Sequence, residues 1–220
     1  MHRLVQAAAR DALATEAPTW TDAALNALAA AFPVPEVKTW PVCERLVSHV
    51  RAVAAQVTTD SHALAWLLGT AADYLQERAA LAEVLPLYER TLAIFERLAA
   101  ADPGNAGWQR DLSVSHNKIG DVLRAQGDLA QALTSYRASL AIRERLAASD
   151  PGNAGWQHDV ALSLQRVGLI AALSADQAGA LTAWCRGLEI TQRLVTLAPD
   201  HAAFRRDRGW FEARIAELDG

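Results

Sequence analysis

The sequence predicts an all-α fold, a right-handed α-α superhelical solenoid, and two observations support this prediction. Alanine, the best helix former, accounts for 47 of the 220 residues, whereas β-branched isoleucine occurs only six times. The eight residues from Asp102 to Gln109 recur unchanged from Asp150 to Gln157, a period of 48 residues. A fixed period of this order is typical of stacked helix pairs with a long concave inner surface.

Each period is predicted to contain two helices. The first covers about residues 106–126, where apolar residues recur at helical spacing. Gly127 ends it, and Asp128 with Gln131 three residues later forms a capping box for the second helix, which ends near residue 149. Asn153 is then placed to cap the first helix of the next pair.

The period divides the chain into two regions. Residues 59–220 form the repeat region, with helix pairs at 61–100, 106–149 and 154–197 and a capping helix at 202–218. Residues 1–58 do not follow the period, and we interpret them as an N-terminal helical cap. Proline-containing breaks separate its expected helices, which lie at about 1–15, 20–31 and 41–57.

Positions one period apart predict how the pairs pack. Small residues at equivalent places on the first helices allow close approach: Ala72, Gly120 and Gly168. Large side chains at equivalent places on the second helices fill the remaining space: Tyr88, Tyr136 and Trp184. By the same argument, Trp108, Trp156 and Phe204 are interpreted as wedges between pairs rather than as a ligand-stacking box.

Composition excludes several function classes. The chain has 21 basic and 25 acidic residues, a net charge of −4, which argues against nucleic-acid binding and gives no reason to expect an anionic membrane partner. No apolar run approaches the roughly 20 residues that span a bilayer. The two cysteines, Cys43 and Cys185, are too few for a disulfide framework, so we expect a reducing, cytoplasmic location.

The repeat resembles the tetratricopeptide repeat (TPR) family. The spacing of small and large residues across the two helices is similar to that family's pattern: Ile119-Gly120, Gly127, Leu129, Ala132, Tyr136 and Leu140. The resemblance covers about residues 61–218, in a long variant of 48 residues rather than the usual period of about 34. It implies a non-catalytic scaffold that binds a peptide or helix of a partner protein in the concave groove.

A second resemblance involves the residues before the repeats. Met1 to Gln6, Phe32-Pro33 and the run from Trp40 to Leu46 are similar to the junction in NB-ARC/STAND-type signalling ATPases. In those proteins a histidine closes over bound ADP, so the resemblance implies this role for His2. The alternative function it implies is the C-terminal sensor or regulatory arm of a split or truncated ATPase. The sequence has no G-x-x-x-x-G-K-[ST] loop, so we expect no cofactor.

The sequence contains no pattern that predicts catalysis or metal binding. None of the six histidines has metal-ligand spacing, and no H-E-x-x-H, C-x-x-C or G-x-S-x-G motif occurs. We therefore predict that the protein is not an enzyme and holds no metal. Cys43 and Cys185 are interpreted as packing residues, and the run Arg143-Glu144-Arg145 as part of a solvated outer face.

First-helix positions opposite the packed face are candidates for partner binding, because stacks of this family expose them in the groove. They mix hydrogen-bonding groups with apolar side chains, as a peptide site requires. The candidates are Trp66, Asp73, Gln76, Arg110, Asn117, Asp121, Arg124, His158, Gln165 and Leu169. The alternative is that these are ordinary solvent-exposed positions. If they bind a partner, Asn117→Ala and Arg124→Ala weaken binding and leave the melting temperature nearly unchanged.

Overall fold

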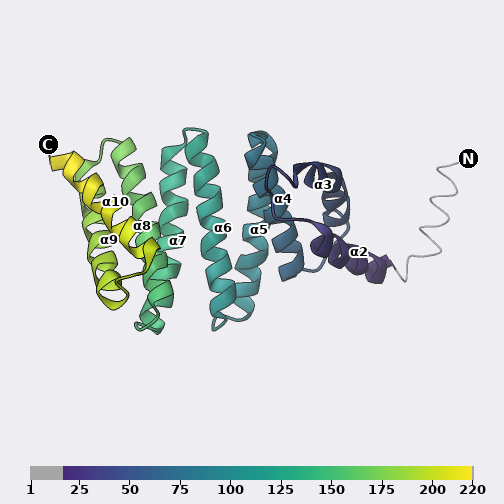
Figure 1. Ribbon diagram of the computed structural model, residues 1–220. Helices are drawn as coiled ribbons and strands as arrows, with labels where there is room; N and C mark the ends of the chain where they lie inside the picture. The colour runs from purple at the N-terminus through teal and green to yellow at the C-terminus, as the bar shows by residue number, and fades with distance from the viewer. Residues whose placement is uncertain (1–16, 220) are drawn as a thin grey trace, which may run out of the picture. The chain divides into compact units, whose positions relative to one another are not determined.

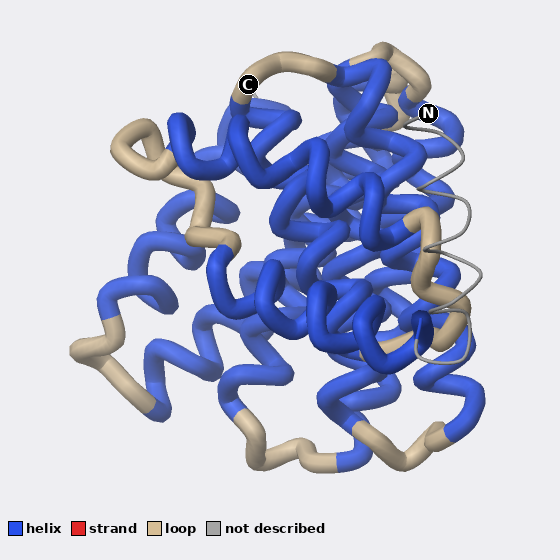
Figure 2. Tube along the Cα trace, turned by 90° about the vertical axis from the view of Figure 1, so that its right-hand side faces the viewer, coloured by secondary structure: helices blue, strands red, loops and turns tan. Residues whose placement is uncertain are grey.

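A computed structural model describes residues 17–219, and within this range the chain forms nine helices and no strand (Figures 1 and 2). The predicted all-α fold class is therefore confirmed. The described residues fall into two compact units, 17–98 and 99–219. The helices, in chain order, are α2 (Ala17–Ala31), α3 (Trp40–Ala54), α4 (His62–Glu77), α5 (Leu81–Ala101), α6 (Ala106–Ala125), α7 (Leu129–Ser149), α8 (Ala154–Leu173), α9 (Gln177–Leu197) and α10 (Ala202–Asp219).

The predicted helix bounds agree with these to within a few residues. The helix expected at 41–57 ends at Ala54. The helix expected at 20–31 begins at Ala17, so Pro18 lies in its first turn, where a missing backbone N–H leaves no hydrogen bond unmade. The helix expected at 1–15 lies outside the described residues.

The first unit joins the N-terminal helices to the first helix pair. Helices α2 and α3 pack against each other and against α4. The indole of Trp40 donates a hydrogen bond of 2.8 Å to Glu77, and Arg90 donates one of 2.5 Å to the carbonyl of Ala54. The boundary predicted at residues 58–59 therefore lies inside this unit, because the N-terminal helices cover one face of the first pair.

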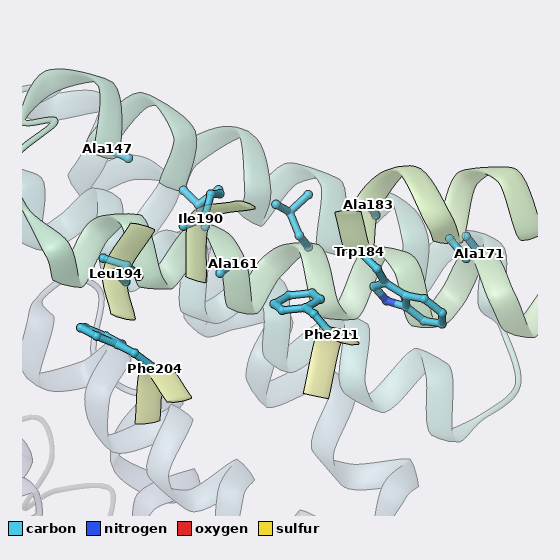
Figure 3. Packing of buried hydrophobic residues seen from close by; sticks show 12 residues of the cluster. Ala147, Ala161, Ala171, Ala183, Trp184, Ile190, Leu194, Phe204 and Phe211 are labelled. Atoms are coloured by element: carbon cyan, nitrogen blue, oxygen red, sulfur yellow. The ribbon is translucent and has the colours of Figure 1, made fainter. Parts of the chain in front are cut away.

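The second unit is a sequential stack in which α6 packs on α7, α7 on α8, α8 on α9 and α9 on α10 (Figure 1). Two phenylalanines of α10 are buried in this stack: Phe211, which is fully buried, and Phe204. Figure 3 shows Phe204 directed toward Leu194 and Phe211 lying near Trp184. The last helix therefore covers the apolar face that the third pair leaves open.

The predicted N-caps form, but the second half of the predicted capping box does not, because Gln131 Nε2 donates to the Asp128 carboxylate and the Asp128 backbone N–H donates to the Leu123 carbonyl. The Asn105 and Asn153 side chains each accept a hydrogen bond of 3.1 Å, from the backbone N–H of Trp108 and of Trp156 respectively. Asp128 accepts one of 3.0 Å from the backbone N–H of Gln131. These bonds satisfy N–H groups that an unprotected helix start leaves without a partner.

The turn between the two helices of each pair uses a left-handed residue at the same repeat position. Its φ is 57° at Ala79, 84° at Gly127 and 61° at Ala175. Glycine adopts this conformation without strain, whereas a Cβ atom makes it costly. Two of the three turns therefore carry a strained alanine.

Ala175→Gly is expected to stabilise the second unit by about 0.5–1 kcal/mol, because relief of the strain exceeds the entropy that glycine adds to the unfolded chain. Gly127→Ala, the reverse change one period earlier, is expected to destabilise it by about 1 kcal/mol. Urea titration followed by circular dichroism measures both. Equal shifts of the same sign in the two variants contradict the strain argument.

Trp108 and Trp156 are both half-buried, and Phe204 is buried. Trp156 packs against the apolar cluster of the second unit. The interpretation of Trp156 and Phe204 as packing residues is confirmed, because their rings contribute to this cluster.

Two interpretations of single residues were wrong. Cys185 is exposed, because it lies on the outward side of α9 next to buried Trp184. Arg143 is buried, with 6% of its surface exposed, instead of lying on a solvated face. Its guanidinium donates hydrogen bonds to Ser113 Oγ (3.1 Å), Ser163 Oγ (3.2 Å) and the Asp159 carbonyl (2.9 Å).

Candidate functional site

A cleft of about 370 Å³ opens between the first helices α6 and α8 of the second unit. Side chains from α7 and α10 complete its walls. It is lined by Asp121, Arg124, Tyr136, Leu162, Gln165, Arg166, Leu169 and Trp210. Four of the ten predicted groove residues meet here: Asp121, Arg124, Gln165 and Leu169.

Helical spacing places these residues on one face of each first helix. Asp121 and Arg124 are three residues apart on α6, and Leu162, Gln165 and Leu169 follow each other at three and four residues on α8. Side chains at such offsets share a face of a helix. The two faces line the same cleft because α6 and α8 are first helices of consecutive pairs.

Asp121 organises the polar side of the cleft. Tyr136 is buried, and its hydroxyl donates a hydrogen bond of 2.6 Å to Oδ1 of Asp121. The same oxygen lies 3.7 Å from Nε of Arg166. Burial raises the pKa of Tyr136, and the hydrogen bond to Asp121 and the charge of that carboxylate raise it further. The phenol therefore stays protonated at neutral pH and holds Asp121 in place.

Apolar side chains form the other side of the cleft. Leu162 and Leu169 come from α8, and Trp210 comes from α10. The Trp210 ring lies edge-to-face on Trp184, with 5.8 Å between centroids, and on Phe211, with 5.3 Å. The two buried rings of Trp184 and Phe211 thus fix the orientation of the half-buried Trp210 ring.

Two predicted groove residues connect consecutive first helices instead of lining the cleft. Arg110 Nε lies 3.3 Å from Oδ2 of Asp159, and His158 Nε2 lies 2.7 Å from Oδ2 of Asp207. Each pair joins positions 49 residues apart, so the two contacts are the same link repeated one period later. His158 also lies edge-to-face on Phe204, with 5.0 Å between ring centroids.

Asn117 was predicted to face the groove, and this prediction was wrong. Only 5% of its surface is exposed, and its buried Oδ1 accepts no hydrogen bond. Asn117→Ala therefore does not test partner binding separately from stability, because the side chain is buried. Asp121, four residues farther along the same face of α6, lines the cleft, so helical spacing alone does not separate the covered position from the open one.

The other three predicted residues lie in the first unit. Trp66 is 38% exposed on α4. The hydroxyl of Tyr88 donates to Asp73 Oδ1 at 2.5 Å and lies 2.9 Å from Gln76 Oε1. The arrangement of Asp73 and Tyr88 repeats that of Asp121 and Tyr136 one period later.

Four residues of the cleft are not among the ten predicted groove residues: Tyr136, Leu162, Arg166 and Trp210. The sequence pattern indicates a packing role for Tyr136 and a place on the capping helix for Trp210, and Leu162 lies on the same first-helix stripe as Gln165 and Leu169. A signal for Trp210 was present, because positions 66, 114, 162 and 210 are one period apart and Trp66 was already a candidate. Tyr136 and Arg166 carried no such signal, because their role depends on their contact with Asp121.

No group of histidine, cysteine and acidic side chains among residues 17–219 is arranged to hold a metal ion. Cys43 is fully buried, and this burial raises the pKa of its thiol above the usual value. Its packing role is therefore confirmed. Within the described range, no helix combines the length and apolar character needed to cross a membrane.

Comparisons with known proteins show the fold and no family. No protein-family model matches the chain, and no curated protein matches it. The chain is similar to the crystal structure of BtubC (BKLC) from P. vanneervenii, with a TM-score of 0.50 and 19% identity over 71% of this chain. The match covers 57% of that protein, so this chain spans a little over half of its length.

A second similar structure is a putative kinesin light chain of nearly identical TPR-like repeats from Podosopora anserina. It has a TM-score of 0.38 and 13% identity, over 80% of this chain and 94% of that chain. These similarities concern the fold alone, a stack of repeated helix pairs. The resemblance to NB-ARC/STAND-type ATPases stays a prediction, and His2, which carries it, lies outside the described residues.

Proposed function

We propose that the protein is a non-catalytic scaffold whose second unit binds an extended peptide segment of a partner protein in the cleft between α6 and α8. The observation that carries this proposal is the cleft itself, where predicted groove residues from two repeats meet. It combines hydrogen-bonding side chains, of which Arg124 is exposed and Gln165 half-buried, with apolar side chains, which is the mixture that peptide sites use.

The proposed site contains fewer residues than the sequence predicted, because three predicted groove residues of the second unit have other roles. Arg110 and His158 are engaged in links between repeats, and Asn117 is buried. In the second unit, partner contact is therefore assigned to Arg124, Gln165 and Leu169, together with Leu162 and Trp210. The first-unit candidates Trp66, Asp73 and Gln76 remain a separate proposal.

Arg124→Ala and Leu169→Asp are expected to weaken partner binding at least tenfold while the melting temperature changes by less than about 3 °C. Arg124 is exposed and Leu169 is half-buried, so neither change removes a core side chain. Aspartate already occupies the position equivalent to Leu169 in the two preceding repeats, as Asp73 and Asp121. Affinity capture from lysate, followed by mass spectrometry, compares the proteins retained by the variants with those retained by the unaltered chain. Overlapping synthetic peptides that cover the sequence of the captured partner then identify the segment that binds.

Arg137→Ala is the matched control, because Arg137 is an exposed arginine on α7 that does not line the cleft. A partner that the control retains and both cleft variants lose supports the proposal. Equal retention by the control and both cleft variants excludes this cleft as the binding site.

The alternative function, a sensor or regulatory arm acting with a nucleotide-binding chain, rests on the sequence resemblance alone. It predicts that an adjacent reading frame encodes a phosphate-binding loop, and that the product of that frame is captured by this chain. Inspection of the neighbouring frames separates the two functions.

A further inference from the structure

We propose that the segment bound in the cleft carries an acidic side chain next to an aliphatic one, with the carboxylate paired to Arg124. This inference rests on the proposed function, because it specifies the chemistry of the segment that the same cleft receives. It is carried by the distribution of charge in the cleft and by the residues at equivalent positions in the other repeats.

The charged groups of the cleft leave one arginine without a carboxylate. Its charged lining residues are Asp121, Arg124 and Arg166. Asp121 already contacts Arg166 and accepts the hydrogen bond from Tyr136. The exposed Arg124 guanidinium interacts with the Tyr136 hydroxyl, a contact that lowers the pKa of the phenol, and among the ion pairs of residues 17–219 none joins Arg124 to a carboxylate. The cleft therefore has a net charge of +1 that is concentrated at Arg124.

The internal repeat shows that Arg124 is not needed to neutralise Asp121. The positions of Asp121, Arg124 and Tyr136 are occupied one period earlier by Asp73, Gln76 and Tyr88, and one period later by Leu169, Ala172 and Trp184. In the first repeat, Asp73 still accepts a hydrogen bond from Tyr88 although glutamine replaces the arginine. The carboxylate therefore belongs with the tyrosine, and packing within a repeat does not require an arginine here.

The size of the cleft and its apolar side chains determine which residue of the segment lies next to the acidic one. A volume of about 370 Å³ is near the lower end of the range for ligand cavities, and it accommodates one or two side chains. Leu162, Leu169 and Trp210 add apolar surface to the lining of the same cleft. A carboxylate at Arg124 leaves this surface to a neighbouring aliphatic side chain, since an unpaired polar group there would lose its hydration.

The test begins with a random library of 12-residue peptides displayed on phage and selected on the immobilised full-length chain. Selected peptides are expected to be enriched in Asp or Glu adjacent to Leu, Ile, Val or Met. For one selected peptide, fluorescence anisotropy compares the acidic form with its Glu→Gln and Glu→Lys versions. The glutamine version is expected to bind about tenfold more weakly, the usual effect of losing one charge-assisted hydrogen bond.

Two variants are compared. Arg124→Gln introduces the residue that the first repeat has at this position, Gln76. Arg137→Gln changes the net charge by the same amount at a residue that does not line the cleft. Arg124→Gln is expected to bind the acidic and glutamine peptides equally, whereas Arg137→Gln keeps the preference for the acidic one. Arg124→Glu is expected to prefer the lysine version. A thermal melt of each variant shows that it is folded.

The outcomes separate this inference from the proposed function. Selected peptides that Leu169→Asp no longer binds, but that show no acidic preference, overturn the inference and leave the proposed function standing. A tenfold acidic preference that persists in Arg124→Gln also overturns it. If no selected peptide depends on a cleft residue, the inference and the proposed function both fail.

Discussion

Gly168→Ala is expected to destabilise the second unit by about 2 kcal/mol, although alanine is the better helix former. A Cβ atom added at Gly168 would lie 2.9 Å from Cε2 of Trp184 and closer still to Nε1 and Cδ1 of the same ring. The indole has no room to move, because it is buried and Trp210 lies edge-on against it. The helices α8 and α9 must then separate, and their packing is lost over several side chains.

Gly209→Ala is the matched control, because it makes the same substitution inside α10. A Cβ atom added there meets no atom within 4 Å, so the expected change is a gain of up to about 1 kcal/mol from helix propensity. Urea titration of both variants, followed by circular dichroism, measures the difference in the free energy of unfolding. A stable Gly168→Ala variant would show that close approach to Trp184 is not what retains glycine at this position.

Arg143→Ala is expected to cost about 3 kcal/mol, because the change leaves a cavity and removes the donor for three acceptors, of which the two serine hydroxyls are buried. Arg143→Met is expected to cost about 1 kcal/mol or less, since methionine fills most of the volume and no charge has to be buried. Burial lowers the pKa of the Arg143 guanidinium, which is the direction expected for a cation taken out of water.

Arg137→Ala is the control for this pair, because Arg137 is exposed on the same helix and is expected to change stability by no more than about 0.5 kcal/mol. The measurement is again urea titration, with the slope of the transition checked for constancy. If the alanine and methionine variants lose equal stability, the hydrogen bonds of the guanidinium are essential, and the filled volume is secondary.

The helix pairs, their caps and their turns were predictable because they depend on residues close together in the chain. Asn105 and Asn153 cap their helices as their spacing to Trp108 and Trp156 indicated. The close approach of Gly120 to Tyr136 and of Gly168 to Trp184 was also predictable, because the same small and large positions recur in each period. The repeat therefore predicted contacts between residues that are 16 positions apart in the sequence.

The environment of single charged residues was not predictable in the same way. Arg143 looks like a surface residue when Arg143-Glu144-Arg145 is considered alone. The equivalent residues Phe95 and Thr191 are both buried, however, and they would have marked position 143 as part of the core. Asn117 was assigned to the groove by helical spacing, which defines a face but not which neighbour covers it.

The sequence by itself determined an architecture of repeated helix pairs, because each pair forms from local hydrogen bonds and has an apolar face that the next pair must cover. Only the tertiary structure decided that Asp121 is shared between Tyr136 and Arg166, and that Arg124 stays without a carboxylate beside the Trp210 wall. Those relations join residues from four helices. Their distances depend on how consecutive pairs stack, which a pattern within one repeat does not specify.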